Sequence, residues 1–387
     1  MRRIQIQNQI LIMLAFFSIS IGLWGNFRQL WLQDNKFSTI DISNIISLGT
    51  LVSVVGIALI GKYVNINKLK KYITCAILLK IINLLVLTFL NKSGLSFIIN
   101  ISIIVDIVLE YSIITSIYPL ITNIIKNDKE FSKRQLTEYL FRDIGILIGG
   151  LFIGRHVLVM LVDYNTCLII STIFLFISLI VIVNIDSSNI KQDKLKTEST
   201  LNYVFSNKLL VLYLVYFFLC NTAMSTALGL KMLTLTNYFN FTDSVATNYF
   251  LIIGLIADVI GIIVLKYFTP KNDYITVTIK FGIRFLGYTL AFMSNNLLVT
   301  LIAITWSILI STSYENICDG PYVNLVENEH QIGFTNLRYI ARFLGEAVGI
   351  FFCGIMYEAG LKYMFGLSAL FMVFQIGIAY YMIYLRK

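Results

Sequence analysis

The sequences YLFRDIGILIG at residues 139–149 and YIARFLGEAVG at residues 339–349 decide the fold of this chain. Both follow the pattern Tyr-x-x-Arg-x-x-Gly-x-x-x-Gly, and they begin 200 positions apart in a chain of 387 residues. Matches that keep their order at one long period are the mark of an internal repeat. Three further pairs recur at nearly the same interval: Arg28 with Lys231, Lys80 with Arg284, and Pro119 with Pro321. We therefore expect the chain to consist of two related halves.

The composition of the chain predicts a membrane protein. It is 57% hydrophobic and 13% charged, with a mean hydropathy of +0.80, whereas a soluble domain averages about 25% charged residues. So few charges cannot cover a soluble α/β core of this size. Apolar runs that extend to about 20 residues are expected to cross a bilayer as helices. The twelve expected spans are 9–33, 44–62, 72–91, 96–125, 135–160, 166–185, 209–233, 245–267, 275–294, 298–324, 334–359 and 361–385.

The predicted fold is an all-α integral membrane protein with twelve transmembrane helices in two pseudo-symmetric six-helix bundles. The N-terminal bundle is expected at residues 1–185 and the C-terminal bundle at residues 209–387. Residues 186–208, the longest polar stretch, are the predicted cytoplasmic linker. Lys and Arg lie mainly in alternate loops, and cytoplasmic loops are the ones enriched in these residues. Both termini of this multi-pass protein are therefore expected in the cytoplasm. The short loops, with no domain outside the membrane, predict a bacterial inner membrane protein.

Several classes of function find no support in the residue types. The net charge of +9 follows the alternation of loops, so it does not predict nucleic-acid binding. The five cysteines form no Cys-x-x-Cys pair, and the two histidines lie far apart, so we expect no metal site. The sequence offers no Ser/His/Asp set, phosphate-binding glycine loop or pore-loop repeat. The chain is expected to be neither an enzyme nor a channel, to need no cofactor and to be a monomer.

Charged residues inside the expected spans are the candidates for function. A charge at the centre of a bilayer costs about 2.5–3.5 kcal/mol on insertion scales, so it requires a partner, water or a use. Asp106 and Glu110 share one face of a helix because they are four residues apart. The other charged residues in the spans include Asp143, Asp258 and Arg338. The candidate proton-coupling and cavity residues are Asp106, Glu110, Arg142, Glu315, Asp319, Arg342 and Glu346.

The depth of these residues within the spans predicts which charges meet. Glu110 should lie level with Arg142, and Glu315 level with Arg342, so each half offers carboxylates opposite an arginine. One interpretation is a network that responds to protons and to solute. The other is a set of static ion pairs that holds each half together without titrating.

Two matched pairs of cations add to the candidates. Arg28 and Lys231 lie near the outer ends of the first and seventh spans, where they are candidates for an outer gate or for anion binding. Alternatively, their long side chains snorkel to the headgroups. Lys80 and Arg284 lie deeper, and internal pairing is the favoured role for both, with Asp106 as the partner of Lys80.

A parallel repeat of six helices, with both termini inside, resembles the major facilitator superfamily of secondary transporters. GKYVNINKLKK at 61–71 keeps the glycine and the basic cluster of that family's loop between helices two and three, but lacks its aspartate and second glycine. DIGILIGGLFIG at 143–154 is similar to the glycine-rich signature of the family's antiporters, without its Gly-Pro. The resemblance implies that helices one, four, seven and ten line a central cavity.

Three hypotheses of function follow. The first is proton-coupled export of a small organic solute by alternating access, which predicts an apolar cavity facing helices four and ten. The second is import or exchange of an organic anion through Arg28 and Lys231, which predicts a basic cavity facing helices one and seven. The third is a lipid flippase or a scaffold without transport, which predicts a lateral opening to lipid. The partners expected for the first are a small solute, protons and the bilayer.

Overall fold

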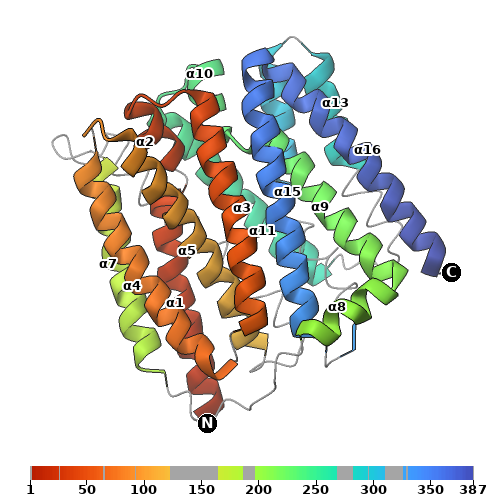
Figure 1. Ribbon diagram of the computed structural model, residues 1–387. Coiled ribbons are helices and arrows are strands. Elements are labelled where there is room, and N and C mark those ends of the chain that lie inside the picture. The colour runs from red at the N-terminus through yellow and green to blue at the C-terminus, as the bar shows by residue number, and fades with distance from the viewer. Residues whose placement is uncertain are drawn as a thin grey trace.

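A computed structural model of the chain describes residues 2–25, 27–63, 66–91, 93–122, 164–185, 197–267, 282–294, 296–309, 326–327 and 330–386. These residues form helices joined by short segments, and no strand occurs among them. Figure 1 shows two groups of long helices side by side, which adjoin at α3 and α15. We call α1 to α7 the first bundle and α9 to α16 the second bundle.

The first bundle contains α1 (Arg2–Gly25), α2 (Arg28–Asp34), α3 (Thr39–Tyr63), α4 (Ile66–Leu90), α5 (Ser96–Thr122) and α7 (Tyr164–Val183). Within it, α1 packs against α7, and α4 and α5 pack against each other. The second bundle contains α9 (Lys208–Leu228), α10 (Lys231–Tyr238), α11 (Asp243–Tyr267), α13 (Ile283–Met293), α15 (Gln331–Ala359) and α16 (Leu361–Arg386). Here α9 lies between α15 and α16, and α13 packs on α16.

The described part of the chain has eight helical stretches that are long and apolar enough to cross a membrane. They coincide with the predicted spans that begin at residues 9, 44, 72, 96, 166, 209, 334 and 361. Shorter apolar helices at 245–257, 283–293 and 297–309 overlap three more predicted spans. The predicted span 135–160 lies outside the described residues, so the total of twelve stays a prediction.

The surfaces of the long helices are apolar where they face outward. Phe89 is 84% exposed and Phe97 is 74% exposed, although both are large apolar side chains. The charged side chains of Lys80 and Asp106, in contrast, are buried between the helices. This distribution suits a lipid environment, in which apolar side chains meet the bilayer and polar groups must be satisfied inside the protein.

The first helix of each bundle is interrupted at equivalent positions. In the first bundle α1 ends at Gly25 and α2 begins at Arg28; in the second, α9 ends at Leu228 and α10 begins at Lys231. These boundaries are separated by the same interval that relates Arg28 to Lys231 in sequence. The predicted spans at 9–33 and 209–233 therefore each consist of two helices, and the second span continues to Tyr238.

Two glycines allow α15 to lie very close to α9. A side-chain carbon at Gly345 would overlap the carbonyl oxygen of Phe218, and one at Gly349 would lie 2.6 Å from the carbonyl oxygen of Thr222. Small residues on one helix face let two backbones approach in this way. The sequence pattern that defines the repeat thus fixes α15 to the second bundle.

The two bundles are joined along α3 and α15. Ser43 Oγ donates a hydrogen bond of 2.8 Å to the carbonyl oxygen of Ile350, and Ser47 Oγ donates one of 2.8 Å to that of Ala347. At the end of the molecule that carries α2 and α10, predicted to be the outer end, Gln29 Nε2 lies 2.7 Å from the carbonyl oxygen of Gly229. This carbonyl is available because Gly229 lies at the interruption between α9 and α10.

The predicted linker contains a helix, α8 (Thr197–Ser206), which packs at the end of the second bundle opposite α10. Tyr203 stacks on the ring of His330 with centroids 4.3 Å apart. Thr200 Oγ1 lies 3.1 Å from Nδ1 of the same histidine, at the start of α15. Part of this polar stretch is therefore a packed helix rather than an extended connection. The boundaries proposed for the two bundles stay predictions.

Candidate functional site

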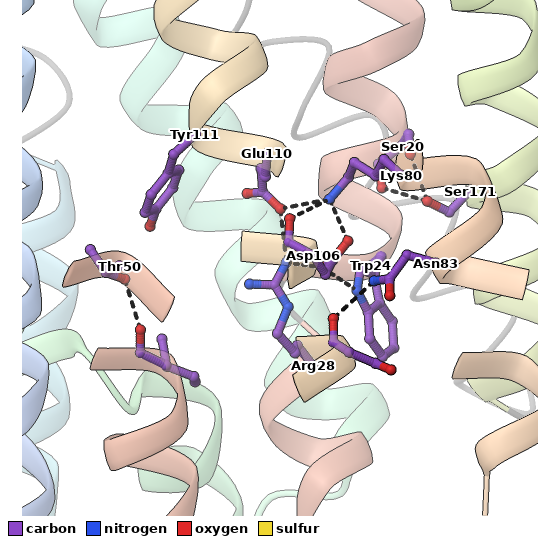
Figure 2. A network of polar contacts seen from close by, with 12 residues as sticks. Ser20, Trp24, Arg28, Thr50, Lys80, Asn83, Asp106, Glu110, Tyr111 and Ser171 are labelled. Atoms are coloured by element: carbon purple, nitrogen blue, oxygen red, sulfur yellow. Dashed lines mark hydrogen bonds and ion pairs between the residues drawn. The ribbon is translucent and has the colours of Figure 1, made fainter. Parts of the chain in front are cut away.

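Four charged side chains meet in the interior of the first bundle (Figure 2). Arg28 comes from the start of α2, Lys80 from α4, and Asp106 and Glu110 from successive turns of α5. Arg28 Nη2 lies 2.7 Å from Asp106 Oδ2 and 2.8 Å from Glu110 Oε2. Lys80 Nζ lies 2.5 Å from Asp106 Oδ1 and 3.3 Å from Glu110 Oε2. We call these four residues the charge network.

Asp106 is the most enclosed member of the charge network, with no exposed surface. Besides the two cations, Trp24 Nε1 donates a hydrogen bond of 2.9 Å to its Oδ2. The Nζ of Lys80 also lies 3.2 Å from the Asp106 backbone carbonyl. A buried carboxylate requires such donors because it has lost its water. Asp106 is therefore held by three side chains from three different helices.

Glu110 and Arg28 form the accessible side of the charge network. Their side chains are 9% and 8% exposed, whereas those of Lys80 and Asp106 are 1% and 0% exposed. Glu110 Oε1 lies 4.0 Å from the place where a side-chain carbon would stand at Gly25. Gly25, the last residue of α1, thus leaves space beside the carboxylate. Glu110 and Arg28 are thus the two members of the charge network whose side chains keep some exposed surface.

The local sequence explains how the charge network assembles. Asp106 and Glu110 are four residues apart on a helix, so both point to the same neighbours. Because α1 ends at Gly25, Arg28 starts a new helix and turns inward to these carboxylates instead of continuing toward the outer end. The two cations and two carboxylates sum to a formal charge of zero. Removal of any one member leaves an uncompensated charge in the interior, which is strongly destabilising.

The second bundle repeats the two cations of this site as Lys231 and Arg284. The ammonium of Lys231 lies 4.9 Å from the centre of the Phe250 ring, a cation–π distance. Arg284 is buried, and its Nη1 lies 3.6 Å from Cys220 Sγ. Both cations of the first bundle thus have counterparts in the second, whereas Glu315 and Asp319 lie outside the described residues.

The structure confirms one expected contact and corrects another. Lys80 pairs with Asp106, as the sequence predicted. The interpretation that Arg28 snorkels to the headgroups is wrong, because its guanidinium is buried between two carboxylates. Glu110 was expected opposite Arg142, which lies outside the described residues, so that pairing stays a prediction. The described partners of Glu110 are Arg28 and Lys80.

The remaining candidates are only partly placed. Asp143, Glu315 and Asp319 lie outside the described residues, and so does the side chain of Asp258. The expected pairing of Glu315 with Arg342 therefore stays a prediction. Arg342 lies 5.8 Å from the centre of the Phe343 ring, and Arg338 lies 4.8 Å from that of Phe217. Glu346 Oε1 accepts a hydrogen bond of 2.6 Å from the hydroxyl of Tyr111.

Two residues of the site were not predicted. Trp24 precedes Arg28 by four positions, and a tryptophan inside an apolar helix requires an acceptor for its N–H; this signal could have identified it as a partner of a buried acid. Tyr111 gives no such signal, because its contact depends on the relative position of α5 and α15. Among the described residues no group of three or more His, Cys, Asp or Glu is arranged to hold a metal.

No protein-family model matches the sequence, and no curated protein matches it. Solved structures do match. The human organic anion transporter MFSD10 (TETRAN) has a TM-score of 0.72 at 12% identity, over 97% of this chain and 99% of its own. The E. coli fucose:proton symporter FucP has a TM-score of 0.67 at 13% identity, over 99% of each chain.

The proton:xylose symporter XylE, a protein of the major facilitator superfamily, matches with a TM-score of 0.70 at 10% identity, over 97% of this chain and 94% of its own. At such low identities the likeness shows the fold. The chain has the fold of the major facilitator superfamily, as the repeat implied. The three structures named here are transporters.

Proposed function

With the fold of the major facilitator superfamily as its premise, we propose that this protein is a secondary transporter that moves a small organic solute by alternating access. Its two bundles would rock about their common contacts, so that a central site opens to one side of the membrane at a time. The solute and protons are the proposed partners, and a bacterial inner membrane, with both termini in the cytoplasm, is the proposed location.

The single observation that supports proton coupling is the buried charge network with Glu110 at its accessible side. While both carboxylates are ionised, the two cations are neutralised. A proton on Glu110 removes one negative charge, weakens the contacts of Glu110 with Arg28 and Lys80, and leaves the charge network with a net charge of +1. The contacts that hold α5 to α2 and α4 therefore change with proton binding, which links the proton to the conformation of the first bundle.

Export is the direction that we propose, with the glycine-rich stretch at 143–154 as its support in the sequence. The test of the function is reconstitution in liposomes with an imposed pH gradient and a screen of organic solutes for gradient-dependent movement. Vesicles of defined orientation would give the direction. If a pH gradient of either sign leaves the distribution of every solute unchanged while exchange proceeds, the proposal of proton coupling is wrong.

The proposed role of Glu110 has a direct test in the variant Glu110→Gln. Glutamine keeps the size and hydrogen bonding of the side chain but cannot ionise, so gradient-driven transport should be lost while solute exchange persists. Asp41→Asn is the matched control, because the Asp41 carboxylate lies at the surface, where it binds Ser38. Wild-type driven transport by Glu110→Gln would exclude this residue as the proton carrier.

A second candidate is the transport of an organic anion, which one observation favours. Both contacts of Arg28 with the carboxylates use Nη2, at the accessible side of the charge network. Once Glu110 is protonated, the charge network carries one excess positive charge, and an anionic group bound at Arg28 would restore neutrality. MFSD10, whose fold is similar, is an organic anion transporter. Anionic solutes that move only with protons, and that require Arg28, would identify this activity.

A further inference from the structure

Tyr111 connects the neighbourhood of the charge network to the second bundle. It follows Glu110 in sequence, and adjacent residues of a helix point about 100° apart. Glu110 therefore points into the first bundle, whereas Tyr111 turns away from the charge network, as Figure 2 shows. Its hydroxyl donates a hydrogen bond of 2.6 Å to Oε1 of Glu346 on α15. A hydrogen bond to an ionised carboxylate is stronger than one between neutral groups.

An aromatic stack accompanies this hydrogen bond. The ring of Tyr111 lies on that of Phe343, with centroids 4.1 Å apart and planes 13° apart. Phe343 and Glu346 are three residues apart, so they share one face of α15. Tyr339 also stacks on Phe343, with centroids 5.9 Å apart. With Ile57 of α3, Tyr339 and Phe343 form a small buried cluster separate from the main core.

The two partners of this contact belong to different bundles. Tyr111 is on α5, which packs against α3 and α4 in the first bundle. Glu346 lies between Gly345 and Gly349, the two glycines that bring α15 close to α9 in the second bundle. Tyr111 and Glu346 also lie near the middle of their helices, at residues 96–122 and 331–359. The hydrogen bond therefore joins, at mid-height, two bodies that alternating access requires to move relative to each other.

We propose that the bond between Tyr111 and Glu346, with its stack on Phe343, is a latch that holds the two bundles in the conformation described here. Tyr111 is then a positioning residue for transport, which acts by placing α5 against α15. The inference rests on the proposed function, because a latch has a use only if the bundles move. Its position beside Glu110 explains how a change in the charge network reaches the second bundle: a shift of α5 at Glu110 displaces the adjacent Tyr111.

The test is the variant Tyr111→Phe, which keeps the ring and its stack but removes the hydroxyl. Loss of a hydrogen bond to a charged acceptor should shift the equilibrium between conformations by roughly ten- to hundredfold. Spin labels at Leu95 and Lys362, exposed residues in the first and second bundles at the predicted outer end, would report this shift as a change in their distance distribution. Glu346→Gln should give a similar shift, and it provides the measurement if Tyr111→Phe does not fold.

The double variant separates a latch from two unrelated effects. If Tyr111 and Glu346 act through one bond, the combined variant should shift the equilibrium no further than the larger single variant does. Tyr288→Phe is the matched control, because it removes a buried hydroxyl that binds Ser307 within the second bundle and should leave the distances unchanged.

Transport kinetics supply a second readout. Tyr111→Phe should change the maximal rate and the apparent affinity for solute in opposite directions, because the population of conformations is altered while the binding groups remain. An unchanged distance distribution in both single variants, or additive shifts in the double variant, would overturn the latch. The distances are measured without a pH gradient, so a failure of proton coupling would not be mistaken for a failure of the latch.

Discussion

Replacing Lys80 by methionine removes one of the four charges of the charge network while keeping most of the side-chain volume. The Lys80 side chain is 1% exposed and its ammonium contacts both carboxylates, so its loss leaves a net negative charge in the interior. Removing one partner of a buried ion pair costs about 3–5 kcal/mol. Asp106 keeps two of its three side-chain donors, Arg28 and Trp24, so we expect the lower end of that range.

Thermal unfolding in detergent measures this loss. At about 2–4 °C per kcal/mol for a unit of this size, a loss of about 3 kcal/mol should lower Tm by about 6–12 °C. Tryptophan fluorescence is a suitable signal, because Trp24 is part of the site and packs edge-to-face on Trp31. Lys70→Met on the same helix is the matched control. Lys70 binds only backbone carbonyls in the described structure, those of Val183 and Ile185, so its loss should cost at most about 1 kcal/mol.

The double variant Lys80→Met with Asp106→Asn tests whether charge balance is the cause. It removes one positive and one negative charge, leaving Arg28 and Glu110 as a neutral pair, so it should be more stable than Lys80→Met alone. Replacing a buried ion pair by neutral residues is often harmless, whereas breaking it is not. A wild-type Tm for Lys80→Met, or a further fall of equal size in the double variant, would refute the argument.

Two further predictions concern the motion and the orientation of the protein. Gln33 Nε2 lies 3.1 Å from Asn237 Oδ1 between α2 and α10, so cysteines at these two positions should react with a short bifunctional reagent. The crosslink should stop transport, because the predicted outer ends of the two bundles can then no longer separate. Transport at the normal rate by the crosslinked protein would contradict this gate. Cysteines introduced at residues 190–196 should be labelled in intact cells only by a permeant reagent, since the Lys and Arg distribution places this segment in the cytoplasm; labelling by an impermeant reagent would invert the topology.

The sequence was sufficient for the parts of the fold that depend on periodic composition. Apolar runs located the helices, and the interval between Arg28 and Lys231 predicted two related halves. The same interval also relates the helix interruptions before these two residues, but the sequence could not reveal them. Gly25 and Gly229 lie in apolar surroundings, where a glycine is as compatible with a continuous membrane helix as with a break.

The candidate site was predicted in composition better than in connectivity. The spacing of Asp106 and Glu110 put them on one face, and the depth of Lys80 identified it as a partner of Asp106. The direction of Arg28 could not be predicted, because it depends on the end of α1 at Gly25. The contact between Tyr111 and Glu346 could not be predicted either. It depends on the register of two helices from different bundles, whereas the sequence pattern shows only which residues share a face of one helix.

The formal neutrality of the charge network has an electrical consequence. A charge that crosses the full membrane potential gains or loses about 2.3 kcal/mol per 100 mV. With Asp106 and Glu110 both ionised, the network moves through that field without net work. A single bound proton makes it a cation of charge +1, on which an inside-negative potential pulls inward. The voltage across the membrane would therefore act, through these four residues, only on the protonated half of the cycle, and transport currents should depend on voltage in that half alone.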